Sequence, residues 1–268
     1  MIYLILFFIF VFGLIIGSFL NCLIWRLHVE EGMMNRSYCP KCKKQIAWYD
    51  NIPVLSFIFL LGRCRHCKKK ISWQYPVVEL ITGILFFIAA IYNLKLTVWN
   101  DFIYLDLIAN YKLWLTLLRD WFIISVMIIV FIYDLRWYLI LDIITLPAIV
   151  IVLILNLILG FNWFILLLAS LIGGGFFLLQ FVISRGEWIG GGDIRLGVLM
   201  GLALGRIDYL ITAIMLAYFI GSIVGIGLMA FKKKQWGSKL PLGVFLSLAT
   251  IITMFTGFEI INWYFGLF

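Results

Sequence analysis

Gly190-Gly191-Gly192-Asp193-Ile194-Arg195 is the stretch at which this chain turns between two long apolar segments. The first segment ends near Ile183 and the second begins at Ile194, so the Asp193 carboxylate is predicted at the boundary of a lipid bilayer. Ionisable groups at membrane depth are unfavourable and usually mark a functional site, although a flexible loop with a solvated aspartate is the simpler alternative. Three consecutive glycines leave room for a bound backbone, so Gly190, Gly191 and Gly192 are predicted to form a substrate-approach loop. A second aspartate, Asp134, lies in a similar place 59 residues earlier and favours the functional interpretation.

The composition is typical of a polytopic membrane protein. Of 268 residues, 65% are hydrophobic and 13% are charged, and the mean hydropathy is +1.11. Because a membrane helix needs roughly 20 apolar residues, the apolar runs predict an all-α protein of about eight transmembrane helices. The sixth run is short and rich in glycine, so it is the weakest prediction, and the first is predicted to be a retained helix rather than a cleaved signal. The runs are 2–25, 76–93, 113–133, 139–160, 162–184, 194–206, 208–231 and 242–266.

The positive charges predict the orientation of the chain. Eight crossings would place 17 of the 21 Lys and Arg residues on one face, and only Lys95, Lys112, Arg119 and Arg206 on the other. Basic loops stay in the cytoplasm, so both termini are predicted outside. The net charge of +8 therefore follows the membrane topology and does not indicate a nucleic-acid partner.

The polar block at 28–75 carries two Cys-x-x-Cys pairs, Cys39 with Cys42 and Cys64 with Cys67. Four thiolates in this pattern are typical of a structural zinc site, which would supply the folding free energy that so small a block lacks. Disulfides are the alternative, but they rarely persist in the cytoplasm, where the topology puts this block. Cys22 is predicted to be a buried thiol without a role. No internal repeat is visible.

Other polar residues near the membrane segments are open to two interpretations. Glu79 either caps the second membrane helix or faces the active site. The apolar residues 57–61 are too few to span and are predicted to lie on the bilayer. Asp142 follows Asp134 by eight residues, which along one helix is about 12 Å, so it would lie deeper and is a rival for the reactive carboxylate.

Two carboxylates on one side of the membrane indicate aspartic-protease chemistry. When held close, they cannot both ionise, and so one serves as general base toward water while the other serves as acid. The substrate is then predicted to be membrane-anchored and cut at the cytoplasmic interface. A proton-coupled transporter is the main alternative, although its carboxylates would lie near the bilayer midplane in two similar halves. A third possibility is a non-catalytic assembly protein that docks partners through the cysteine block.

Taken together, these features resemble the type IV prepilin leader peptidases, the bifunctional aspartyl proteases and N-methyltransferases of type IV pilus, type II secretion and competence systems. The resemblance covers most of the chain. It rests on Gly17-Ser18-Phe19-Leu20-Asn21 with Arg26-Leu27, the two cysteine pairs, Trp48-Tyr49-Asp50-Asn51-Ile52-Pro53, Tyr75-Pro76-Val77-Val78-Glu79-Leu80, Asp134 with Asp142, and the Gly-x-Gly-Asp motif at 190–193.

The resemblance implies that Asp134 and Asp193 are the catalytic pair, in preference to Asp142. It implies removal of a short basic leader from prepilins and pseudopilins in the bacterial inner membrane, with the active site facing the cytoplasm. Methylation of the new N-terminus by S-adenosylmethionine would follow, and Cys39, Cys42, Cys64 and Cys67 would hold structural Zn²⁺. The implied division is a first helix at 1–27, a zinc-knuckle domain at 28–75 and a membrane protease domain at 76–268. Besides the substrate, the expected partner is membrane lipid.

Several positions depart from the family pattern, and neither Asp134 nor Asp193 is among them. They bear on substrate preference and methylation more than on proteolysis. Glu187 is predicted to contact the basic leader. The departures are His28, Gln74, Leu141, Arg195, Leu242 and Val244.

Overall fold

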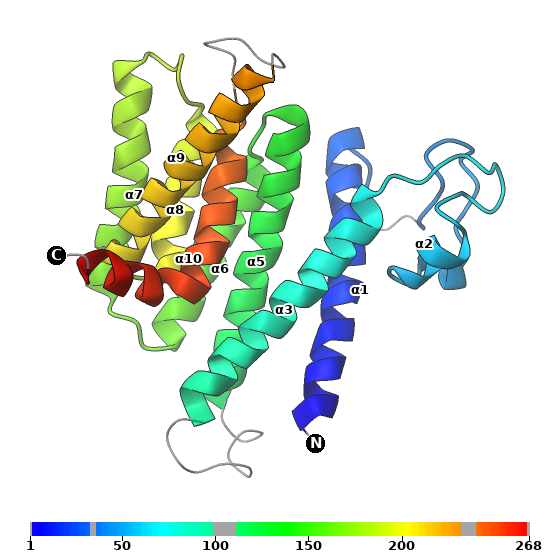
Figure 1. The fold of residues 1–268 in the computed structure, drawn as a ribbon, viewed down its shortest axis with the longest axis horizontal. Helices are drawn as coiled ribbons and strands as arrows, with labels where there is room; N and C mark the ends of the chain where they lie inside the picture. Colours follow the sequence, from blue (N-terminus) through cyan, green and yellow to red (C-terminus); the bar gives the residue numbers. More distant parts are fainter. Residues whose placement is uncertain (1, 33–35, 99–110, 232–239, 267–268) are drawn as a thin grey trace. The chain divides into compact units, whose positions relative to one another are not determined.

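All eight predicted membrane segments form helices in a computed structural model, which describes residues 2–32, 36–98, 111–231 and 240–266 (Figure 1). The chain forms two compact units, Met1–Leu107 and Ile108–Phe268, which are described separately. The helices of the first unit are α1 (Ile2–Val29), η1 (Trp48–Asn51), α2 (Leu55–Phe59) and α3 (Gln74–Val98). Those of the second are α5 (Tyr111–Trp137), α6 (Asp142–Ile158), α7 (Trp163–Ile183), α8 (Gly191–Leu204), α9 (Ile207–Ala230) and α10 (Leu242–Phe265).

Six of these helices are long and apolar enough to cross a membrane, namely α1, α3, α5, α7, α9 and α10. The other two predicted segments are shorter, since α6 has 17 residues and α8 has 14. The sixth predicted segment, which was the weakest prediction, therefore corresponds to α8, the shortest helix of the second unit within the described residues. Of the residues used in the charge argument, Lys232, Lys233, Lys234 and Lys239 lie outside the described residues.

The first unit is built on close contact between α1 and α3. A Cβ atom added to Gly17 would lie 2.6 Å from the Glu79 Cα, and one added to Gly13 would lie 2.8 Å from the Gly83 Cα. The Asn21 amide donates a hydrogen bond to the Tyr75 carbonyl at 3.0 Å. These contacts show that small and polar residues of α1 permit close helix packing.

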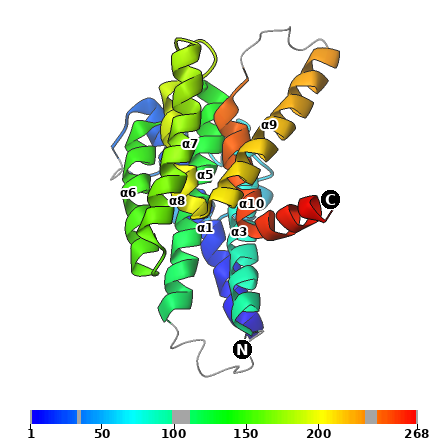
Figure 2. The same cartoon turned by 90° about the vertical axis from the view of Figure 1, so that its left-hand side faces the viewer.

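The second unit packs around α8, which contacts α6, α7, α9 and α10. Figures 1 and 2 both show α8 beside α7 within this bundle. Their backbones touch at small residues, because a Cβ atom on Gly197 would lie 2.5 Å from the Gly173 carbonyl oxygen. Gly173 and Gly174 both lie at this close helix contact, whereas Gly175 has no neighbour within 4 Å of its added Cβ.

Two sequence interpretations are wrong in this fold. Asp142 does not lie deeper along the helix of Asp134, because α5 ends at Trp137, Tyr138 takes a positive φ of 56°, and α6 begins at Asp142. Glu79 is not an N-terminal cap of α3. Its carboxylate instead accepts a hydrogen bond at 2.7 Å from the Val54 N–H, which fixes the strained Val54 backbone (φ 61°) against α3.

Candidate active site and cysteine cluster

Asp134 lies near the C-terminal end of α5 and is 5% exposed. Its Oδ2 atom accepts a hydrogen bond at 3.1 Å from the Val244 N–H, in the first turn of α10. The first N–H groups of a helix have no partner within their own helix, so they are natural donors to a carboxylate. The start of α10 therefore holds the Asp134 side chain.

Asp193 lies in the first turn of α8 and is 8% exposed. Its Oδ2 atom accepts a hydrogen bond at 3.0 Å from the Gly190 N–H, which caps the helix. The glycine stretch is thus the beginning of α8 and not a free loop beyond Gly190. A carboxylate in this position is favoured by the helix dipole.

The structure brings Asp134 and Asp193 close enough for their charges to repel each other. The side chain of Ile140 packs beside both, since a Cβ atom on Gly192 would lie 2.8 Å from the Ile140 Cβ, and one on Gly243 would lie 3.0 Å from its Cδ1. The same atom on Gly243 would lie 2.9 Å from the Asp134 Oδ2. Two acids and two helix starts therefore meet around one buried isoleucine.

Asp142 and Arg195 lie in a different environment. They form an ion pair, and their side chains are 50% and 40% exposed. An exposed, paired carboxylate is poorly suited to proton exchange in a desolvated site. Glu187, predicted to contact a basic leader, is exposed on the loop before α8, which leaves it accessible.

Sequence reasoning assigned no role in this site to Ile140, Gly243 or Val244, and noted Val244 only as a departure from the family pattern. Val244 contributes a backbone N–H, and Gly243 contributes only the absence of a side chain, so neither has chemistry that a sequence reveals. Pro241 directly before α10 was the available signal, because proline often precedes or opens a helix whose first N–H groups are unpaired.

The second candidate site is the cluster of Cys39, Cys42, Cys64 and Cys67, whose sulfur atoms all lie within 4.8 Å of one another. All four are free thiols, and the sulfurs of Cys39 and Cys67 are 4.0 Å apart. A tetrahedral site with metal–sulfur bonds of about 2.3 Å has sulfur separations of about 3.8 Å, so the arrangement fits a metal ion after small adjustments.

The two knuckles of this cluster repeat one local structure 25 residues apart, which corrects the expectation of no internal repeat. Isolated antiparallel bridges join Tyr38 to Gln45 and Arg63 to Lys70. The Cys39 carbonyl accepts from the Lys43 N–H at 2.8 Å, and the Cys64 carbonyl accepts from the Lys68 N–H at 2.9 Å. Repeated geometry delivers two pairs of sulfurs to one point.

The thiols of the cluster compete for protons. Backbone N–H groups of Cys67 and His66 stabilise the Cys64 thiolate and lower the pKa of this thiol to about 7. At Cys42 the Lys44 N–H acts in the same direction, but burial and three neighbouring thiols outweigh it and raise the pKa to about 11. A bound cation would favour the thiolate form of all four.

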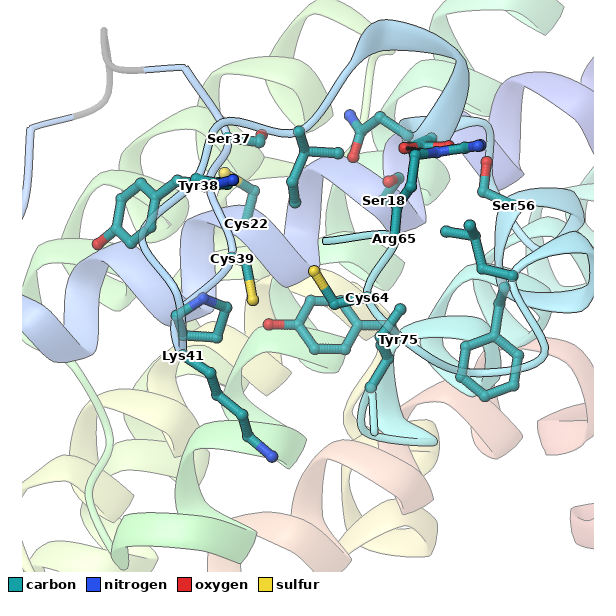
Figure 3. Close-up of a pocket in the computed structure, with 18 of the residues that line it drawn as sticks. Ser18, Cys22, Ser37, Tyr38, Cys39, Lys41, Ser56, Cys64, Arg65 and Tyr75 are labelled. Carbon is teal, nitrogen blue, oxygen red and sulfur yellow. Dashed lines mark hydrogen bonds and ion pairs between the residues drawn. The ribbon is translucent and has the colours of Figure 1, made fainter. Parts of the chain in front are cut away.

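A cavity of about 200 Å³ lies beside the cluster within the first unit. Figure 3 shows the sulfur atoms of Cys39 and Cys64 pointing into the same space, with Tyr75 and Tyr38 nearby. The wall of the cavity also includes Trp25 and Cys22. Cys22 is therefore half-buried and lines the cavity, which corrects the prediction that it is a buried thiol. Charged groups of both signs lie on the wall, namely the acids Glu31, Asp50 and Glu79 and the basic residues Arg26, Lys41, Lys44, Arg65, Lys69 and Lys70.

An ion pair ties the segment between the knuckles to the second knuckle. Arg65 donates two hydrogen bonds to Asp50, from Nε at 2.8 Å and from a terminal nitrogen at 2.6 Å. These bonds hold the pKa of the Asp50 carboxyl below its usual value. The segment at 48–54 is therefore fastened on both sides, to Arg65 and to Glu79.

Comparison with known proteins matches both parts of the chain. Residues 11–93 match the bacterial peptidase A24 N-terminal domain, and residues 121–226 match the type IV leader peptidase family. A prepilin leader peptidase/N-methyltransferase of Aeromonas hydrophila is 31% identical over 289 residues, which cover 96% of this chain and 92% of the relative. The chain belongs to the type IV leader peptidase family.

Other members of the family with the same name are similar over nearly their whole length. The protein of Legionella pneumophila is 30% identical, and the aligned region covers 95% of this chain and 92% of the relative. The protein of Bacillus subtilis is 29% identical, and the aligned region covers 95% of this chain and 96% of the relative. No solved structure matches the chain. Membership in this family makes the protein a multi-pass membrane aspartic peptidase of the A24 type.

Proposed function

We propose that this protein removes the short basic leader of type IV prepilins and pilin-like proteins at the cytoplasmic face of the bacterial inner membrane, and then methylates the new N-terminus. The observation that carries the proposal is the buried pair of Asp134 and Asp193. The two aspartates are 59 residues apart in sequence and belong to different helices, and each is held by the N–H group of a helix start. The family and the full-length relatives support the same activity.

Two neighbouring carboxylates can share one proton. The ionised carboxylate accepts a proton from a water molecule as it attacks the peptide carbonyl carbon, and the protonated one donates to the carbonyl oxygen. In the second step a carboxylate donates a proton to the leaving amine. The Val244 and Gly190 N–H groups hold one oxygen of each acid, which leaves the other oxygen available to water and substrate.

The proposal assigns Asp134 and Asp193 as the catalytic residues and Gly190 to Gly192 as the approach for the substrate backbone. Gly191 has no atom within 4 Å of an added Cβ, so it offers open space, whereas Gly192 is already packed on Ile140. The acid on the loop before α8, Glu187, is proposed to contact the basic leader.

Cleavage of a prepilin peptide by the purified protein in lipid vesicles tests the proposal. We expect Asp134→Asn and Asp193→Asn to abolish the shortened product while thermal unfolding stays unchanged. Asp208→Asn, which alters an exposed pair with Arg206, is the matched control and should cleave normally. Cleavage that survives Asp134→Asn and is lost in Asp142→Asn would move the catalytic role to Asp142.

Zinc is proposed as the metal of the cysteine cluster, because a four-thiolate tetrahedral set is typical of structural Zn²⁺. Its role is to hold the two knuckles, and no step of proteolysis involves it. We expect close to one zinc per chain by elemental analysis of the purified protein, and less than half of that after Cys39→Ser.

S-adenosylmethionine is the methyl donor in this proposal, and the cavity of the first unit is its proposed site. The donor carries a positively charged sulfonium and a flat adenine ring, and it supplies the methyl group to the new amine. Aromatic walls from Trp25 and Tyr75 suit the ring, and carboxylates such as Glu31 suit positive charge.

Donor binding can be measured without catalysis. In calorimetry with the protease-inactive Asp193→Asn protein, we expect saturable binding of S-adenosylmethionine that Trp25→Ala weakens at least tenfold. Trp163→Ala, an exposed tryptophan of the other unit, is the control. Equal affinity in all three proteins would remove the cavity from consideration.

A further inference from the structure

The helix that carries Asp193 ends inside the bundle, at Leu204. With 14 residues, α8 is about 21 Å long, which is shorter than the roughly 30 Å hydrocarbon core of a membrane. Its last residues, Leu202 to Leu204, are buried. The final carbonyl groups of a helix have no partner within it, and water is not available to satisfy them here.

Two side chains from other helices reach these carbonyl groups. Arg119 of α5 donates a hydrogen bond to the Ala203 carbonyl at 3.0 Å, and Asn156 of α6 donates to the Leu202 carbonyl at 2.7 Å. Arg119 is 8% exposed, and its guanidinium group lies over the Phe161 ring and 3.3 Å from the Asp120 carboxylate. A positive charge at a helix C-terminus also complements the helix dipole.

The contact of Arg119 and the pair of acids join the same two helices at opposite ends. On α5, Arg119 and Asp134 are 15 residues apart, or about 22 Å, and on α8, Asp193 and Ala203 are ten residues apart, or about 15 Å. The two helices therefore run antiparallel, and the shorter distance on α8 is made up by the length of the arginine side chain. The helices that α8 packs on most closely are α7 and α6, not α5.

We infer that Arg119 is a positioning residue, which sets the register of α8 along α5 and thereby the separation of the two carboxylates. The inference rests on the proposed catalytic role of Asp134 and Asp193. A sliding movement of α8 along its axis would carry Asp193 with it, because a helix is stiff along its length. The Arg119 hydrogen bond resists that movement at the end that is free of the substrate.

The test uses the full-length protein in lipid vesicles and compares Arg119→Met with the wild type. A shift of about 1 Å between reacting groups can lower a rate about 100-fold, so we expect kcat to fall 10-fold to 100-fold while KM changes less than twofold. The bell-shaped pH–rate profile should also narrow, because two acids that move apart interact less and their apparent pKa values approach each other. Arg119→Lys should recover part of both losses, and it replaces Arg119→Met if that variant does not fold.

Arg206→Met is the control, since Arg206 lies at the same end of the bundle but pairs with Asp208 at the surface. It should retain the wild-type kcat and profile width. Wild-type kcat and an unchanged profile in both Arg119 variants would overturn the inference, and a fall in kcat explained wholly by the unfolded fraction would do the same. Either result leaves the proposed function intact, because that function fails only if Asp134→Asn and Asp193→Asn still cleave.

Discussion

At the scale of single residues, the proposed catalytic geometry depends on a missing side chain at Gly243. A Cβ atom there would lie 2.9 Å from the Asp134 Oδ2, closer than real Cβ contacts allow. The obstructed group is the end of the Asp134 side chain, so it can rotate away, but it then loses its hydrogen bond from the Val244 N–H. We expect Gly243→Ala to lower kcat about 100-fold by this displacement, while the temperature of thermal unfolding falls by only about 2–4 degrees, the shift produced by a loss of about 1 kcal/mol.

Gly175→Ala is the matched control for that variant, because its added Cβ meets no atom within 4 Å on helix α7. Replacing an unhindered helical glycine by alanine stabilises a protein by about 0.4–1 kcal/mol. Gly175→Ala should therefore keep full activity and unfold at a slightly higher temperature. Full activity in Gly243→Ala would mean that Asp134 does not need its present position.

Sequence reasoning at this scale identified the chemically distinctive residues and missed the contacts that orient them. A carboxylate at the end of an apolar run is conspicuous because it is unfavourable in lipid, so Asp134 and Asp193 could be predicted. The choice between Asp134 and Asp142 could not be made from spacing, because the turn at Tyr138 is invisible in the apolar pattern. The Val244 N–H and the buried Arg119 were missed because their roles depend on helices far away in sequence.

At the scale of helices, the fit of α8 against α7 is made by a row of small residues. Ala169 and Gly173 of α7 face Gly197 and Gly201 of α8, where an added Cβ on Gly201 would lie 2.5 Å from the Ala169 carbonyl oxygen. Here the obstructing atoms are backbone atoms, which cannot rotate away. We expect Gly201→Ala to destabilise the second unit by about 1–3 kcal/mol and to lower activity with it, as measured by thermal unfolding and peptide cleavage.

The control for the helix contact is Gly227→Ala in α9, whose added Cβ meets no atom within 4 Å. A fully stable Gly201→Ala protein would show that α7 can move away from α8 without loss. The apolar runs predicted every one of these helices, but their glycines indicated only that close packing was possible. Which pairs of glycines face each other follows from the rotation of each helix, and a sequence does not contain that information directly.

At the scale of the whole molecule, two compact units divide the chemistry. The second unit holds the paired acids within its own helix bundle, whereas the first holds the cysteine cluster and the cavity beside it. The cysteine block has little regular structure among its described residues beyond η1, α2 and two isolated bridges. The sequence predicted both sites, but it did not reveal that α3 packs on α1 as part of the first unit.

This division predicts that removal of metal affects the two units differently. A block held by four thiolates loses its folding free energy with the ion, so a chelator should expose the segments around Cys39 and Cys64 to trypsin and abolish donor binding. The second unit has its own core, and its thermal unfolding should stay unchanged. Cys22→Ser should behave as the wild type in metal content, because Cys22 lies outside the cluster, whereas Cys67→Ser should reproduce the effect of the chelator. Trypsin resistance that persists after the metal is gone would mean that contacts such as Glu79 with Val54, and not the ion, hold the block together.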